Sequence, residues 1–333
     1  MSSEFDLIRQ LAPFLTADTE PGVAVGHGDD AAVLDLGDKW VCVAVDVVVD
    51  GVHFRRDVSS PEDVGWKAVA VNVSDLAAMG ATSSAAVVGL CRPADVPAAE
   101  IEALYRGMRA ACDHWGVRLV GGDTVHAQAL ALSVTAIGSV VPGQAVTRGG
   151  ARPGDALVLV GTLGAAAAAL LQIGAGEDAA PSLLAAHRRP MALAQAGPAL
   201  AAHGATAMID ISDGLGADLG HLCAASETGA TVDAARLPIA DGVIGAAMAH
   251  GKDPFDLACG GGEDFALLAA VPADQAEAAA AAASAAEGVT ATIIGTITQG
   301  PEVAMVEAGG RRRPLAGLGY DHYRTSAADA EDS

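Results

Sequence analysis

Aspartates at the ends of predicted strands, several of them beside glycine, are the strongest chemical signal in this chain. Six groups occur, and they are Gly28-Asp29-Asp30, Val45-Asp46, Asn72–Asp75, Gly121–Thr124, Asp210–Gly214 and Gly260–Asp264. Carboxylate oxygens are the hard ligands that Mg²⁺ takes, usually with water and substrate phosphates. Glycine neighbours let the backbone approach closely and present N–H donors to phosphate oxygens. Together the groups predict a site for magnesium and a polyphosphate.

Each group taken alone has an ordinary structural reading. Asp-Gly pairs are common turn chemistry, and Ser212-Asp213-Gly214 could simply cap a helix. Six such groups occur, however, and most of them follow a β-like run, so ordinary turns alone explain them poorly. Known phosphate loops are absent from the sequence, because Ala246 stands where a Walker A motif before Gly251-Lys252 needs glycine, and no G-x-G-x-x-G follows a strand.

The elements that must position these acids read as an α/β fold in two domains. In the first half the predicted strands are 31–34, 40–45, 84–90 and 130–140, and the predicted helices are 5–15, 61–79 and 97–114. In the second half the predicted strands are 156–160, 206–210, 265–270 and 290–297, and the predicted helices are 163–173, 189–202, 214–227 and 273–286. The Gly-, Arg- and Pro-rich segment Thr147–Asp155 predicts the boundary, which gives domains at 1–146 and 147–324 and a disordered tail at 325–333. Arg311–Arg313 reads as a solvated hairpin tip.

Composition excludes several classes of protein. Forty-one acidic against 19 basic residues give a net charge of −22, which argues against nucleic acid as a partner. The five cysteines are widely spaced in apolar surroundings, as expected of a reducing cytoplasm. The N-terminus lacks a basic leader, and the uncharged run 156–176 reads as a strand, a turn and a helix, so we expect no membrane segment.

Larger blocks of sequence carry a family resemblance over about residues 4 to 323. The blocks are Gly28–Val33, Asp50–Phe54, Asn72–Gly80, Gly121–Thr124, Arg148–Asp155, Asp210–Leu215, Gly260–Phe265 and Gly319–Tyr323. Their order resembles the thiamine-monophosphate kinase family, within the superfamily of aminoimidazole ribonucleotide synthetase and selenophosphate synthetase. The Gly-Asp-Asp, Gly-Gly-Asp and Gly-Gly-Glu-Asp elements are shared across that superfamily, whereas Gly51–Phe54, Asn72–Gly80 and Gly319–Tyr323 are more specific to the kinase.

The resemblance implies direct in-line transfer of the ATP γ-phosphoryl group to thiamine monophosphate, assisted by several Mg²⁺ ions. It implies a homodimer in which a mixed sheet of the N-terminal domain forms a barrel with its partner, and a C-terminal α/β domain that covers the cleft. The implied metal ligands are Asp29, Asp30, Asp46, Asp75, Asp123, Asp210 and Asp213, with Asp29 acting through water and Asp30, Asp75, Asp123 and Asp210 as catalytic residues. The implied ATP contacts are Gly122, Asp123, Arg148, Ser212 and Tyr105, and the implied acceptor contacts are His53, Glu263 and Tyr320.

The chain departs from the family pattern in two places. Ala44 and Val45 stand before Asp46 where the family usually has hydroxyls, and Gly317-Leu318 stand where it often has an aromatic, which Tyr320 would replace. Two alternatives therefore stay open at the level of sequence. One is another ATP-using enzyme of the superfamily, such as aminoimidazole ribonucleotide synthetase, and the other is a non-catalytic regulator that binds nucleotide and Mg²⁺.

Overall fold

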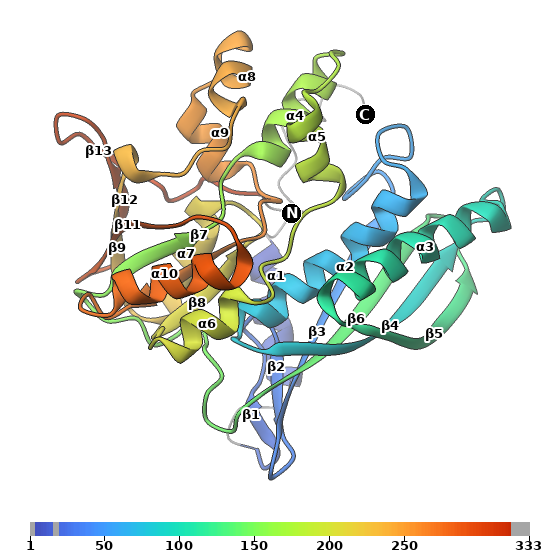
Figure 1. Cartoon of the computed structure of the whole chain (residues 1–333), viewed down its shortest axis with the longest axis horizontal. Helices are drawn as coiled ribbons and strands as arrows, with labels where there is room; N and C mark the ends of the chain where they lie inside the picture. Colours follow the sequence, from blue (N-terminus) through green and yellow to red (C-terminus); the bar gives the residue numbers. More distant parts are fainter. Residues whose placement is uncertain (1–3, 16–19, 321–333) are drawn as a thin grey trace.

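The structure is a computed structural model that describes residues 4–15 and 20–320, and the predicted tail lies outside this part of the chain. Two mixed sheets organise it, one in each half of the sequence (Figure 1). Residues 141–155 connect the last strand of the first sheet to the first strand of the second and include the predicted boundary segment. The mixed α/β architecture is as expected, and the division into two domains stays a prediction.

The first sheet has six strands in the order β1-β2-β3-β6-β4-β5, of which only β4 and β5 are parallel neighbours. Its strands are β1 (Val23–Val25), β2 (Ala32–Asp35), β3 (Trp40–Val49), β4 (Thr82–Arg92), β5 (Arg118–His126) and β6 (Ala131–Val140). The helices of this half are α1 (Glu4–Leu11), the short 3-10 helix η1 (Ala12–Phe14), α2 (Pro61–Ala78) and α3 (Ala98–Trp115). Helix α2 begins at the predicted residue, with Pro61 in its first turn, and the structure adds a capping box between Ser60 and Asp63.

Helices α2 and α3 pack on one face of this sheet (Figure 1), and the described side chains on its other face, here called the bare face, are half-buried or exposed. They cross so closely that a Cβ added at Gly65 or Gly107 would lie within about 2 Å of a backbone carbonyl of the facing helix. On the bare face the β3 side chains Val45 and Val47 are 59% and 46% exposed. Strand β5 forms an open edge, and nearly all of its residues are exposed. The first half therefore presents to solvent an apolar face and, on β5, an unpaired strand edge.

The second sheet has seven strands in the order β13-β12-β9-β11-β7-β10-β8, with β9 and β12 parallel. Its strands are β7 (Ala156–Val160), β8 (Ala207–Ile211), β9 (Gly229–Asp233), β10 (Ala266–Val271), β11 (Ala291–Thr298), β12 (Val303–Val306) and β13 (Arg312–Pro314). Its helices are α4 (Ala165–Gly174), α5 (Pro181–Arg188), α6 (Ala196–Ala202), α7 (Leu215–Ala225), the 3-10 helix η2 (Ala234–Arg236), α8 (Val243–Ala249), α9 (Pro254–Gly260) and α10 (Ala276–Glu287).

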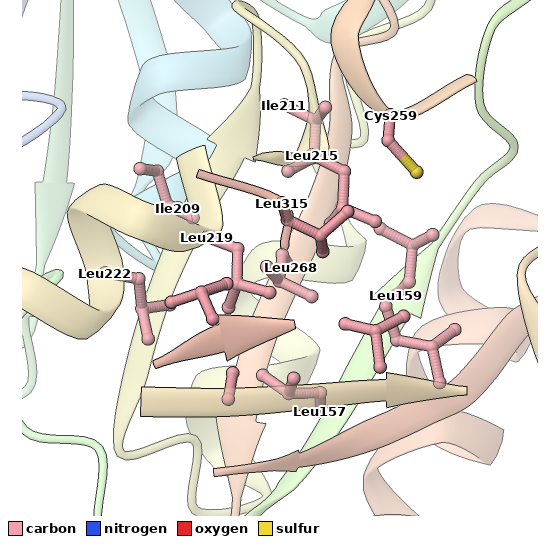
Figure 2. Close-up of a cluster of buried hydrophobic side chains, with 14 of the residues drawn as sticks. Leu157, Leu159, Ile209, Ile211, Leu215, Leu219, Leu222, Cys259, Leu268 and Leu315 are labelled. Carbon is pink, nitrogen blue, oxygen red and sulfur yellow. The ribbon is translucent and has the colours of Figure 1, made fainter. Parts of the chain in front are cut away.

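Strands β7, β8 and β10 are buried along their whole length because helices cover both of their faces. Alternate side chains such as Leu157 and Ile209 pack against α7 leucines, as Figure 2 shows. The intervening side chains pack against α6 and the alanine-rich α10. The last turn of α2 also enters this second cluster through Ala77 and Ala78. Helix α2 thus touches both sheets, which lets it carry side chains into a site between them.

Three parts of the sequence prediction are wrong. The predicted helix 189–202 begins only at Ala196, because Pro190 disfavours helical backbone at Arg189, which has φ −133° and ψ 71°. Strands β1, β5, β9, β12 and β13 and helices α5, α8 and α9 were not predicted. Arg313 is no solvated tip residue, since it lies in β13, is 21% exposed and pairs with Asp253 and Asp256.

The uncharged run 156–176 divides into the buried strand β7 and the helix α4, as expected. Among the residues described, no helix combines the length and the hydropathy that crossing a membrane requires.

Candidate active site

A cleft of about 470 Å³ is lined by residues of both halves, and its lining side chains fall into two chemically different groups, which we call its two ends. Its polar end is lined by Asp29, Asp30, Asp46, Asp75, Arg148, Asp210, Ser212, Asp213, Asp218 and His221. Its other end is lined by His53, Phe54, Val58, Lys67, Val71, Leu170, His187, Glu263, Phe265 and Tyr320. The first set suits a polyanion with metal ions, and the second suits an apolar ring with a polar or cationic substituent.

Three carboxylates form the centre of the polar end. Asp30 precedes β2, Asp75 lies on α2, and Asp210 lies on β8. One oxygen from each falls within 4.8 Å of the others, so the fold gathers acids that are far apart in the sequence. Asp29 and Asp46, also predicted as ligands, line the same end of the cleft.

Burial and mutual repulsion make ionisation of these carboxyl groups unfavourable. Burial, followed by the charge of Asp30, raises the pKa of Asp29 from 3.8 to about 7. Burial, again with the charge of Asp30, raises the pKa of Asp210 to about 8. For Asp75, burial and the charges of Asp46 and Asp210 raise the pKa well above its usual range. The cluster is therefore poorly compensated by the protein alone.

Arg148 supplies part of the missing positive charge. Its backbone N–H donates to Asp29 Oδ1 at 3.0 Å, and its guanidinium donates to Asp30 Oδ1 through Nε at 3.2 Å and Nη2 at 2.5 Å. Burial still raises the pKa of Asp30, although the arginine opposes this. The other oxygen of Asp30, Oδ2, is buried and has no hydrogen-bond partner among the described residues. A donor set made only of carboxylate oxygens, with one of them unpartnered, fits Mg²⁺.

Buried polar residues that sequence reasoning did not assign hold this cluster in place. Ser74 Oγ donates to Asp210 Oδ2 at 2.7 Å, and Asn72 Oδ1 accepts the backbone N–H of Asp46 at 3.0 Å. Asp218 accepts the backbone N–H groups of Asp213 and of the glycine after it, at 3.1 and 3.0 Å. The available signal was the presence of Asn and Ser inside an otherwise apolar helix, where unpaired polar groups are costly.

At the other end, Glu263 is held by two buried side chains that the sequence did not single out. Lys67 Nζ donates to Glu263 Oε1 at 2.5 Å, and His187 Nδ1 donates to Oε2 at 2.7 Å. Burial alone would raise the pKa of Glu263, but the charge of Lys67 and the hydrogen bond from His187 lower it to about 2. This carboxylate is therefore ionised throughout the physiological range.

The loop that carries Glu263 is strained. Glu263 and Phe265 have φ values of 60° and 48°, a region that residues other than glycine rarely adopt. Such strain costs on the order of 1–3 kcal/mol per residue and clusters at functional sites. The neighbouring Asp264 is directed elsewhere, since its Oδ1 accepts the N–H of Gly164 at 2.8 Å. Of these two adjacent acids, Glu263 lines the cleft, whereas Asp264 binds the backbone before α4.

The remaining predicted residues divide between the cleft and the surface. Ser212 and Asp213 line the cleft, as does Tyr320, whose backbone N–H donates to the Asp213 carbonyl at 3.0 Å. Gly122 and Asp123 do not join them, because they lie exposed within the edge strand β5. Tyr105 packs on α3 against the core of the first half and does not line the cleft either. A single chain therefore brings most of the predicted site together, without these three residues.

Both halves of the chain match known proteins. Residues 28–140 match the family model described as AIR synthase related protein, N-terminal domain, and residues 152–307 match its C-terminal domain. Thiamine-monophosphate kinase of Mycobacterium tuberculosis is 41% identical over 277 residues, which cover 81% of this chain and 83% of that protein. The Escherichia coli enzyme of the same name is 36% identical over 313 residues, which cover 91% of this chain and 93% of that protein.

A solved structure described as AaThiL complexed with AMPPCP and TMP superposes with a TM-score of 0.83 at 31% identity, covering 96% of this chain and 97% of that one. The matches span both sheets and the cleft between them. On this basis the chain belongs to the thiamine-monophosphate kinase family.

Proposed function

We propose that this protein transfers the γ-phosphoryl group of ATP to thiamine monophosphate and forms thiamine diphosphate. The observation that carries the proposal is a cleft that contains three clustered carboxylates and also a separate glutamate, which Lys67 and His187 keep ionised, together with apolar side chains. The family of the chain and a related structure that holds AMPPCP and TMP support the same reaction.

The acceptor chemistry explains why no strong base is required. The second pKa of a phosphate monoester is near 6, so the attacking oxygen is mostly deprotonated at neutral pH. The main obstacle is repulsion between two anions, which is about 4 kcal/mol per pair of unit charges at about 4 Å and an effective dielectric of about 20. Bound Mg²⁺ would supply the positive charge that offsets this repulsion and helps to align an in-line transfer.

We assign the polar end of the cleft to metal and ATP. Asp30, Asp75 and Asp210 would hold Mg²⁺ directly, with Asp46 and Asp213 beside them and Asp29 acting through water. Arg148 would hold a phosphate oxygen through its planar guanidinium, and Ser212 lies at the same end.

We assign the other end to thiamine monophosphate. Phe54 and Phe265 would flank its rings, while Glu263 offers a negative charge to a cation or an amino group of the acceptor. His53 and Tyr320 line the same end and complete the proposed acceptor site.

We further propose that the protein acts as a homodimer through the bare face of the first sheet. Exposed Val45 and Val47 make that face costly to leave in water, and the open edge of β5 is a surface on which other strands can pair. Gly122 and Asp123 lie on that edge, so their proposed roles toward ATP and metal depend on a partner chain. A Val45→Asp variant tests the dimer, since it should yield monomers in light scattering.

The reaction is tested by incubating purified protein with ATP and Mg²⁺, with and without thiamine monophosphate, and measuring thiamine diphosphate. We expect product only when the thiamine ester is present. Asp75→Asn should lower turnover by a factor of about 10² or more without unfolding the protein, whereas the exposed control Asp178→Asn should not. ATP hydrolysis that ignores the ester would favour a sister enzyme, and nucleotide binding without turnover would favour a regulator.

A further inference from the structure

The segment His187–Ala192, which comprises the end of α5 and the first residues after it, fastens the second half of the chain to helices α2 and α3. Trp66 Nε1 donates to the Pro190 carbonyl at 2.8 Å, and Trp115 Nε1 donates to the Ala192 carbonyl at 3.1 Å. Arg189 pairs with Asp63 at the start of α2 and lies over the Trp66 ring at 5.9 Å. We call residues 187–192 the strap. It runs along α2 and ends, at His187, beside Glu263.

Lys67 approaches the same carboxylate from the first half of the chain. The Lys67 and His187 side chains are 3% and 4% exposed, whereas that of Glu263 is 23% exposed. Burying an ammonium group is costly unless it is paired and hydrogen-bonded. All three side chains line the cleft, and the lysine and the histidine each take one carboxylate oxygen, so the glutamate is the most exposed member of the group. A carboxylate accepts about four hydrogen bonds in all, which leaves acceptor capacity on Glu263 for a bound molecule.

The same ammonium also fixes the loop that carries His53. Lys67 Nζ donates to the His53 backbone carbonyl at 2.9 Å. The His53 ring accepts the backbone N–H of Val49 at Nδ1, at 3.2 Å, which places the ring proton on Nε2. One lysine thus ties together two of the residues assigned to the acceptor, one from each half of the chain.

We propose that Lys67 and His187 are positioning residues for the phosphate acceptor: they hold the Glu263 carboxylate, and Lys67 also holds the His53 loop, in the orientation that binds thiamine monophosphate. The inference deepens the proposed function and rests on it. Neither residue approaches the carboxylate cluster in any hydrogen bond or ion pair described here, so they act on the acceptor and leave ATP binding unchanged.

Steady-state kinetics with Lys67→Met and His187→Gln test this assignment. We expect kcat/KM for thiamine monophosphate to fall by about 10- to 100-fold, mainly through KM, as is typical when a group that orients a ligand-binding residue is lost. The dissociation constant of AMPPCP, measured without the acceptor, should stay within about twofold. Trp66→Phe is the matched control, since it removes a bond to the strap without touching Glu263, and it should leave both quantities unchanged.

A double-mutant cycle distinguishes positioning from a general role in stability. If Lys67 acts through Glu263, Lys67→Met should raise the acceptor KM less in a Glu263→Gln background than in the unaltered protein, and the part that remains reports its hold on the His53 loop. This double variant leaves no unpaired buried charge, so it keeps the test usable if Lys67→Met alone folds poorly.

Two results would overturn the inference: an unchanged acceptor KM in both single variants, or an equal loss of AMPPCP and acceptor binding. Failure of the proposed function itself is distinguishable, because the unaltered protein would then form no thiamine diphosphate.

Discussion

Replacing Asp210 by asparagine should stabilise the metal-free protein at alkaline pH, although it removes a proposed metal ligand. The Asp210 side chain is buried, and its pKa is raised from 3.8 to about 8. A carboxyl group whose pKa is higher in the folded than in the unfolded chain favours folding at low pH. That contribution is lost as the pH rises from about 4 to about 8, because over this range the unfolded chain has released a proton that the folded protein still holds.

The size of the effect follows from the shift. One pKa unit corresponds to about 1.4 kcal/mol, so a shift of about 4 units sets an upper limit near 6 kcal/mol. The neighbouring acids share the charge, so that removing one relieves only part of the repulsion. We therefore expect a gain of about 2–3 kcal/mol for Asp210→Asn at about pH 8, or about 5 °C in Tm.

Thermal unfolding between about pH 5 and about pH 8.5 in the presence of EDTA measures this effect. The unaltered protein should lose stability as the pH rises, and Asp210→Asn should lose less. Added Mg²⁺ should raise the Tm of the unaltered protein most at high pH, where the carboxylates are ionised, and should raise that of Asp210→Asn less. Asp178→Asn removes one exposed charge and should follow the unaltered protein. The reasoning is refuted if Asp210→Asn is the less stable protein at about pH 8 without metal, or if pH has no effect.

Three further outcomes can be measured. Gly107→Ala should destabilise the protein by several kcal/mol in chemical denaturation, because the new Cβ would lie 1.9 Å from a carbonyl of α2, whereas the helical control Gly220→Ala has open space and should gain about 0.5–1 kcal/mol. Inactive Asp75→Asn and Asp123→Asn chains should regain activity when mixed under conditions of subunit exchange, if Asp123 serves the partner's cleft, and no recovery in a proven mixed dimer would contradict that role. Ser74→Ala removes a buried hydrogen bond to the proposed metal ligand Asp210 and should lower the affinity for Mg²⁺ by about 10- to 100-fold. The affinity is measured from the rise in Tm as Mg²⁺ is added, and an unchanged titration midpoint would show that Ser74 does not orient the site.

The periodicity of apolar residues along the sequence predicted several of the helices and strands. Side-chain alternation predicted β3 and β6, and the apolar run after Pro61 predicted α2, because periodicity reports which face of an element is buried. Strand β5 was missed because Gly121-Gly122-Asp123 reads as a turn, and it becomes a strand only by pairing with β4. The helix predicted at 189–202 begins later because Pro190 disfavours helical backbone at Arg189, and the carbonyls of Pro190 and Ala192 accept hydrogen bonds from tryptophan side chains of α2 and α3 instead.

The chemistry of the candidate site divides in the same way. Residue type and spacing by themselves indicated a carboxylate site for metal and phosphate, and the structure gathers Asp30, Asp75 and Asp210 as that reading requires. Lys67 and His187 carry no such signal, because a lone lysine or histidine in an apolar helix has many ordinary explanations. The contact of Lys67 with Glu263 spans 196 residues and exists only because α2 packs against both sheets. The sequence therefore determined which chemical groups were available, and tertiary packing decided which of them are buried together, ionised and directed into one cleft.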